Sequence, residues 1–291
     1  GLGLVAWWFG AREPALKKLQ DTLECVPTSA ELHHRAGLLA LRCSSLDDSL
    51  THLERAVALG RANGSPRLGV YLQQLAGVLA NAGRHDEADE LFEEAAPHVE
   101  LGTRSEVALL TNWGASRALR GLLSSVELGE RALSLCRELR DDLILPMVLH
   151  NLARGTLAAG DVERSRALLT ESVEVARANR STWLAMVLCL LGATWEAERP
   201  DRAESLWREG LEEARRVNEA SVAAELWARL ALLHLERGDA HGACRDLAMV
   251  GDIADAPAHV QALVQRAREA VSATESLPGS RSLQRRAAAR R

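Results

Sequence analysis

The sequence lacks the features that mark β-proteins, nucleic-acid binders and membrane proteins. Aromatic residues make up only 3% of its 291 residues. No stretch alternates apolar with polar residues, so half-buried strands are not expected. The net charge of −5 predicts no direct contact with nucleic acid, because domains that bind it usually carry a strongly basic face. No apolar run approaches the roughly 18 residues of a membrane-spanning helix, so no membrane partner is predicted.

Sequence signatures of catalysis, metal binding and redox chemistry are also missing. There is no HExxH, Walker, GxSxG or dinucleotide motif. His33 and His34 point about 100° apart on a helix and cannot chelate a metal together. The acids that follow His85 fit the first turn of a helix, which favours negative charge. We therefore predict a chain that is not an enzyme, with no catalytic residue, no metal and no cofactor.

The cysteines are odd in number and widely spaced, and no two have metal-ligand or redox spacing. They are Cys25, Cys43, Cys136, Cys189 and Cys244. We expect buried apolar thiols in a reducing, cytoplasmic compartment. Of the 35 basic residues only Lys17 and Lys18 are lysine, a bias that suggests a GC-rich bacterial genome.

Good helix formers dominate the sequence, and small residues recur in it at fixed spacing. The clearest unit, residues 72–99, has Ala76, Gly83, Ala88 and Ala95 at these positions. Two helices joined by a tight turn approach closely only where small side chains face each other, and glycine readily ends the first helix in the left-handed conformation. This pattern predicts a pair of antiparallel helices.

The same four positions recur six more times, twice with a slip of one residue. The sets are Gly3, Gly10, Ala15 and Thr22; Gly37, Ser44, Ser49 and Ala56; Gly114, Gly121, Ser125 and Ala132; Ala153, Gly160, Ser165 and Ser172; Gly192, Glu198, Ala203 and Gly210; and Ala231, Gly238, Ala243 and Val250. Over residues 1–253 the chain resembles the tetratricopeptide repeat (TPR). The last positions of successive sets lie 34, 39, 37, 40, 38 and 40 residues apart, and all but the first exceed the 34-residue period of that family. The longer units look like the variant of kinesin light chains and of large bacterial signalling ATPases and transcription regulators.

The resemblance implies an all-α fold, a right-handed α-solenoid of antiparallel helix pairs. We expect a truncated first repeat at residues 1–27, six helix pairs at 28–255, a capping helix at 256–273 and a disordered Arg-rich tail at 274–291. A first helix cut at its beginning indicates that the chain is part of a larger polypeptide.

The resemblance also implies that the first helices of the repeats line a concave face that holds the ligand. Two positions before the first small residue lie Arg35, Gln74, Asn112, Asn151 and Arg229, with Cys189 in the slipped fifth unit; one position earlier lie His34, Gln73, Thr111, His150, Leu188 and Ala228. The predicted ligand-binding residues are Arg35, Gln73, Gln74, Thr111, Asn112, His150, Asn151, Arg154 and Arg229. Asn and Gln can pair with both backbone groups of a peptide, and Arg with a carboxylate. The alternative is that these positions are polar only because they are exposed.

These features predict a non-catalytic module for protein–protein interaction, which binds a protein segment or peptide in the concave groove. A different class of function fits the same sequence. The chain could be a sensory or autoinhibitory arm of a larger bacterial regulator, a kinase or an ATPase-linked transcription factor, where it would bind an effector.

Overall fold

The computed structural model describes residues 12–42, 45–254 and 256–275, and every regular element in these ranges is helical. The predictions for the opening half-helix and for the Arg-rich tail after Glu275 lie outside the described residues. No helix in the described ranges is long and apolar enough to cross a membrane. The chain divides into two compact units, Gly1–Asn179 and Arg180–Arg291.

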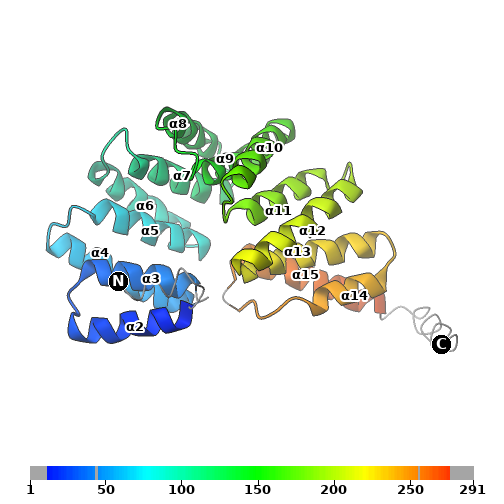
Figure 1. Ribbon diagram of the computed structural model, residues 1–291, viewed down its shortest axis with the longest axis horizontal. Helices are drawn as coiled ribbons and strands as arrows, with labels where there is room; N and C mark the ends of the chain where they lie inside the picture. The colour runs from blue at the N-terminus through cyan, green and yellow to red at the C-terminus, as the bar shows by residue number, and fades with distance from the viewer. Residues whose placement is uncertain (1–11, 43–44, 255, 276–291) are drawn as a thin grey trace. The chain divides into compact units, whose positions relative to one another are not determined.

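The first unit is a row of antiparallel helices in which each helix packs on the next (Figure 1). Its helices are α2 (Arg12–Cys25), α3 (Ala30–Arg42), α4 (Leu46–Ala62), α5 (Leu68–Asn81), α6 (His85–Ala95), the 3₁₀ helix η1 (Ala96–His98), α7 (Arg104–Leu119), α8 (Ser124–Glu138), α9 (Leu145–Ala158) and α10 (Val162–Ala178). The pairs α3–α4, α5–α6, α7–α8 and α9–α10 are the predicted repeats, and α7 also packs on α5 and α9. The first helices of successive repeats are therefore neighbours.

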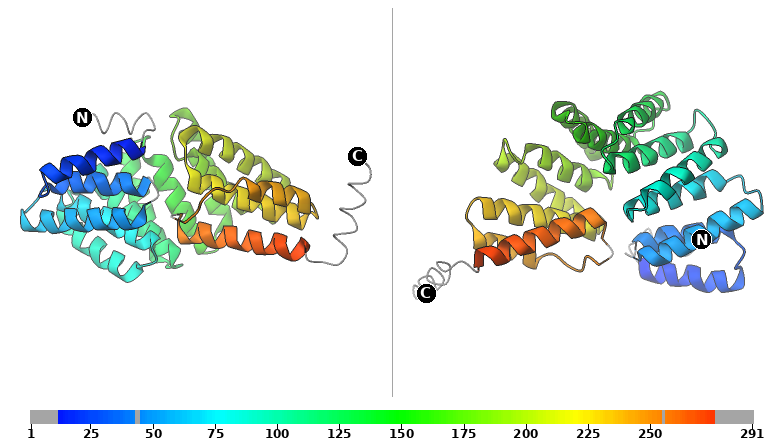
Figure 2. Two further views of the ribbon diagram at one scale, coloured as in Figure 1. Left: turned by 90° about the horizontal axis from the view of Figure 1, so that it is seen from below. Right: turned by 180° about the vertical axis from the view of Figure 1, so that it is seen from behind.

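The second unit continues the same arrangement with two pairs and a final helix. Its helices are α11 (Leu184–Trp195), α12 (Pro200–Val217), α13 (Ala220–Glu236), α14 (Ala240–Ala248) and α15 (Ala258–Glu275). Helix α15 lies along α13 and α14 (Figure 2), where Val260, Val264 and Ala267 are buried. The fold is thus an α-solenoid of antiparallel helix pairs, as expected.

The small residues lie where the two helices of a repeat meet. Ala76, Ala88 and Ala95 are fully buried in one core cluster. A Cβ atom on Gly37 would lie 2.7 Å from Cγ of Leu53, so this position has no room for a side chain. The turn glycines fit their predicted role, since Gly83, Gly121, Gly160 and Gly238 have φ between 67° and 86°. In these repeats the spacing of small residues thus reflects close helix packing.

We expect Ala88→Leu to destabilise the first unit by about 1–3 kcal/mol, because extra methyl and methylene groups in a packed core force neighbouring side chains and backbone to shift. The measurement is urea denaturation followed by circular dichroism. The matched control is Glu90→Leu on the exposed side of the same helix, which introduces the same side chain and should change stability by less than about 0.5 kcal/mol. Equal midpoints for the two variants would contradict the register of the repeat.

The cysteine prediction holds for Cys136 and Cys189, which are buried, but is wrong for Cys25, which is exposed. Cys25 is the last residue of α2 and precedes an exposed loop, residues 26–28. Cys244 is half-buried, and Cys43 lies outside the described residues. Burial, reinforced by the nearby acid Asp141, raises the pKa of Cys136 to about 11, so this thiol is protonated and unreactive at neutral pH.

Candidate binding surface on the first helices

Each first helix leaves the same positions partly exposed. Counted from the first small residue of the repeat, these positions are six before, two before and one after it, and they are half-buried in all six first helices from α3 to α13. A spacing of four and then three residues puts them on one side of a helix. We call this row of positions the inner stripe. In the first unit it comprises Glu31, Arg35 and Leu38 of α3; Val70, Gln74 and Gly77 of α5; Ala108, Asn112 and Ala115 of α7; and Met147, Asn151 and Arg154 of α9.

Six of the nine predicted residues lie on the inner stripe, and three do not. Gln73, Thr111 and His150 occupy the position three before the small residue, and all three are buried. One residue along a helix turns the side chain by about 100°, which here takes it from the surface into the interface between helices. A ligand on the inner stripe would not touch these three side chains.

The positions three before the small residue, which we call the buried row, also change the assignment in the fifth helix pair, α11–α12. Gly192 faces the ring of Trp207, where an added Cβ would lie 2.3 Å from Nε1, so Gly192 is the small residue of that repeat. Leu190 is therefore on the inner stripe, and Cys189 belongs to the buried row. The prediction that Cys189 occupies the position two before the small residue is wrong, because that position was counted from the second helix across a turn without glycine.

His34 and Thr111 show how the buried row is accommodated. The hydroxyl of Thr111 donates a hydrogen bond to the backbone oxygen of Val107 at 2.7 Å. The ring of His34 packs against that of Tyr71, with centroids 5.1 Å apart. Burial lowers the pKa of His34 to about 4, so the ring is neutral at physiological pH. These side chains have structural roles between helices.

The middle of the inner stripe presents two amide groups that the fold does not use. Among the described residues, the side chains of Gln74 and Asn112 have no hydrogen-bond partner. Small residues lie beside both amides on the stripe, since Gly77 follows Gln74 on α5 and Ala108 and Ala115 flank Asn112 on α7. A Cβ on Gly77 would meet nothing within 4 Å, so the space beside these amides is open. The amide donors and acceptors of Gln74 and Asn112 thus lie at a surface that the backbone of a ligand could approach closely.

At the α3 end of the stripe, Arg35 is engaged by an acid of its own helix. Arg35 Nε donates to Glu31 Oε1 at 2.6 Å, and Glu31 also pairs with Arg67 and accepts from the hydroxyl of Tyr71 at 3.3 Å. Burial opposes the ionisation of Glu31, but Arg35 and Arg67 outweigh it and lower the pKa of this carboxyl. Glu31 therefore stays charged at neutral pH, and a ligand carboxylate would compete with it for Arg35.

At the α9 end of the stripe, the amide of Asn151 makes one local bond. Its Nδ2 donates to the backbone oxygen of Met147 at 3.1 Å, one turn earlier on the same helix. This bond uses the amide nitrogen, and within the described residues the side-chain oxygen accepts no hydrogen bond. We call Gln74, Asn112 and Asn151 the amide ladder, since they occupy equivalent positions of α5, α7 and α9.

In the second unit the charge of Arg229 is compensated within the fold. Arg229 Nη2 lies 2.8 Å from Glu225 Oε1, Nη1 lies 3.8 Å from Glu196 Oε2, and the guanidinium covers the ring of Trp207 at 5.9 Å. Burial would raise the pKa of Glu225, but His259 of α15 and Arg229 outweigh it and hold that pKa at about 2. This cluster connects the C-terminal cap of α11 with α12, α13 and α15, so Arg229 contributes to packing and is not free to bind a carboxylate.

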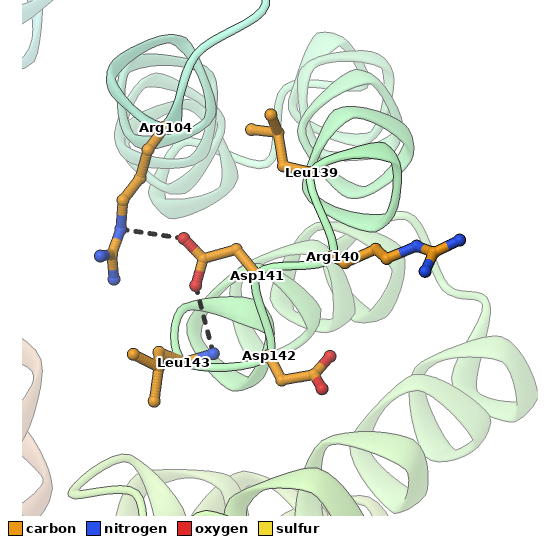
Figure 3. A pocket seen from close by; sticks show the side chains of 6 residues that line it. All are labelled: Arg104, Leu139, Arg140, Asp141, Asp142 and Leu143. Carbon is orange, nitrogen blue, oxygen red and sulfur yellow. Dashed lines mark hydrogen bonds and ion pairs between the residues drawn. The ribbon is translucent and has the colours of Figure 1, made fainter.

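One depression of about 490 Å³ lies at the loop between α8 and α9 (Figure 3). It is lined by Arg104, Leu139, Arg140, Asp141, Asp142 and Leu143. Asp141 accepts from the backbone nitrogen of Leu143 at 3.2 Å and forms an ion pair with Arg104 at 3.1 Å. These contacts hold the loop between α8 and α9 in place. Within the described ranges, no group of three or more His, Cys, Asp or Glu residues is placed to hold a metal ion.

Comparison with known proteins identifies the fold. No family model matches the chain, and no curated protein matches it in sequence. The structure is similar to that of Rap protein complexed with competence and sporulation factor, with a TM-score of 0.73 and 12% identity over 94% of this chain and 78% of that one. It is also similar to a signal transduction ATPase with numerous domains and a TPR sensor from Pyrococcus horikoshii, with a TM-score of 0.56 and 11% identity over 92% of this chain and 41% of that one. TPR-like repeats assigned to a kinesin light chain of Podosopora anserina match with a TM-score of 0.50 and 19% identity, over 69% of this chain and 98% of that one. The chain therefore has a TPR-like fold.

Proposed function

We propose that the chain is a non-catalytic interaction module and that the inner stripe of its first unit binds an extended segment of a protein partner. The observation that carries this proposal is the pair of partly exposed amides, Gln74 and Asn112, on neighbouring first helices with no internal hydrogen bond. An amide left without a partner at a half-buried surface is costly, and a ligand that supplies one recovers that free energy.

The chemistry of the amide ladder suits the backbone of a peptide. Each amide offers two N–H donors and one acceptor oxygen, so it can pair with the C=O and the N–H of one extended residue. Gly77, Ala108 and Ala115 lower the surface around the ladder and make room for the ligand's side chains. At the α3 end, an acidic group of the segment would compete with Glu31 for Arg35.

The structural neighbours are consistent with such a role. Rap protein is described in complex with competence and sporulation factor, which is an example of a similar fold that binds a factor. We propose the same class of activity for this chain, with a protein segment as ligand.

The second candidate function is a sensory arm of a larger bacterial regulator. It is favoured by the similarity to the ATPase from Pyrococcus horikoshii, whose TPR part is described as a sensor. In this case the inner stripe would bind an effector and control a kinase or P-loop domain of the same polypeptide. Ligand-dependent activity of such a linked domain would support this candidate over a stand-alone interaction module.

We expect Gln74→Ala combined with Asn112→Ala to weaken ligand binding by about 5-fold to 100-fold, because each lost hydrogen bond is worth about 0.5–1.5 kcal/mol. Peptides selected from a random display library on the wild-type chain provide the ligands, and fluorescence anisotropy gives Kd. Circular dichroism should be unchanged, because neither amide bonds to the fold. The control is Glu90→Ala with Glu93→Ala, two exposed residues of the second helix α6, which should leave Kd unchanged. Equal Kd values for the ladder variant and the wild type would refute the proposal.

A further inference from the structure

Two histidines from different helices meet at the start of the first complete repeat. His33 lies in the first turn of α3 and His52 in the second turn of α4. Their Nδ1 atoms are 3.1 Å apart, and their ring centroids are 5.3 Å apart. Both side chains are half-buried, and α3 packs closely along α4, so the fold holds the two rings in place.

The surroundings of His33 orient its ring. Its Nε2 lies 3.2 Å from the backbone oxygen of Pro27, an acceptor that requires the proton on Nε2. In the neutral ring Nδ1 then carries a lone pair, which points toward His52. A histidine that donates one N–H to a backbone carbonyl and presents its other nitrogen is the usual arrangement of a metal ligand.

The separation of the two nitrogens fits a shared ion. Two ligands of a tetrahedral zinc, at about 2.0–2.1 Å each, lie about 3.3–3.4 Å apart, so a shift of a few tenths of an ångström from 3.1 Å would admit the ion. Without metal, a hydrogen bond from Nδ1–H of His52 to Nδ1 of His33 accounts for the contact, and metal binding would displace that proton to Nε2 of His52. Asp48 is exposed one turn before His52 on the same side of α4 and adds negative charge beside the pair.

We propose that His33 and His52 form a two-imidazole binding site for Zn²⁺, completed by water molecules and neutralised in part by Asp48. This site is independent of the inner stripe and needs no property of the proposed ligand. Zinc would join the first turn of α3 to α4.

The test is isothermal titration of the full chain with Zn²⁺ at pH 7.4, with a phosphine reductant to keep thiols reduced. Wild type is expected to take up one more equivalent of Zn²⁺ per chain, at micromolar affinity, than either His33→Asn or His52→Asn. His98→Asn, an exposed histidine in η1, should retain the wild-type stoichiometry.

A second measurement on the unmodified chain keeps the test decisive if a variant fails to fold. In imidazole-selective spectra, zinc should shift the ¹⁵N resonances of Nδ1 of His33 and Nδ1 of His52. The proposal is overturned if wild type and both variants bind the same number of Zn²⁺ ions. It is equally overturned if 100 µM Zn²⁺ leaves both Nδ1 resonances unmoved.

Discussion

Trp207→Ala is expected to destabilise the second unit by about 3–5 kcal/mol, the usual cost of removing a large aromatic side chain from a core. Trp207 is fully buried, and its Nε1 donates to the backbone oxygen of Cys189 at 3.0 Å. Its ring fills the space that Gly192 leaves on α11. Hydrogen exchange of the α11–α13 amides, compared between variant and wild type, gives the change in the free energy of local unfolding.

The matched variant for this experiment is Trp207→Phe. Phenylalanine keeps most of the buried ring but loses the Nε1 hydrogen bond and leaves the oxygen of Cys189 without that donor. We expect a smaller cost, of about 1–3 kcal/mol. The control is Leu101→Ala at an exposed site (79% exposed). If it changed the free energy of local unfolding as much as Trp207→Ala, the described packing of α12 against α11 would be contradicted.

Glu225→Gln is expected to cost about 3 kcal/mol, near the lower end of the range for breaking a buried ion pair. The side chains of Glu225 and Arg229 are 16% and 20% exposed, so little solvent screens the charge that remains on Arg229. Glu196 stays 3.8 Å from that guanidinium in the variant and limits the loss. Chemical denaturation at pH 7, followed by circular dichroism, measures the difference. The control is Glu213→Gln, whose partner Arg216 is more exposed and should cost less than about 1 kcal/mol.

The effect of Glu225→Gln should depend on pH with a definite sign. The pKa of Glu225 is held at about 2 in the folded chain, against 4.5 for an ordinary glutamate. A carboxyl with a lowered pKa stabilises the fold above pH 4.5, and this contribution is lost as the pH falls toward 2. The difference in stability between wild type and variant should therefore shrink across that range. Burial raises the pKa of Glu196, but this group is present in both chains and its effect largely cancels. A difference that stayed constant down to pH 2 would contradict the assignment.

The sequence predicts the helix pairs well because their determinants are local. Small residues such as Ala88 and turn glycines such as Gly83 act through the contacts of one repeat, so their spacing is visible without the fold. The exposed position of the fifth helix pair, α11–α12, is predicted less well, because the turn of this pair has no glycine that fixes the count.

The exposure of individual side chains is harder to predict from the sequence, because it depends on how each helix is rotated about its axis and on contacts with residues distant in sequence. Gln73 and Gln74 are adjacent and chemically identical, and only the packing of α5 decides which one is exposed. The pair Glu225–Arg229 can be recognised in the sequence by its spacing of four residues. The third member, Glu196, lies 33 residues before Arg229 and cannot be recognised in this way. Likewise His52 lies 19 residues from His33, so the sequence drew attention to the neighbouring His34, which points elsewhere.

The amide ladder occupies three consecutive first helices of the first unit, α5, α7 and α9. Axes of packed helices are about 8–10 Å apart, so three helices span about 16–20 Å. An extended chain advances about 3.3 Å per residue. An extended segment bound along the ladder, as proposed, would therefore contact it over about five or six residues, whatever the full length of that segment.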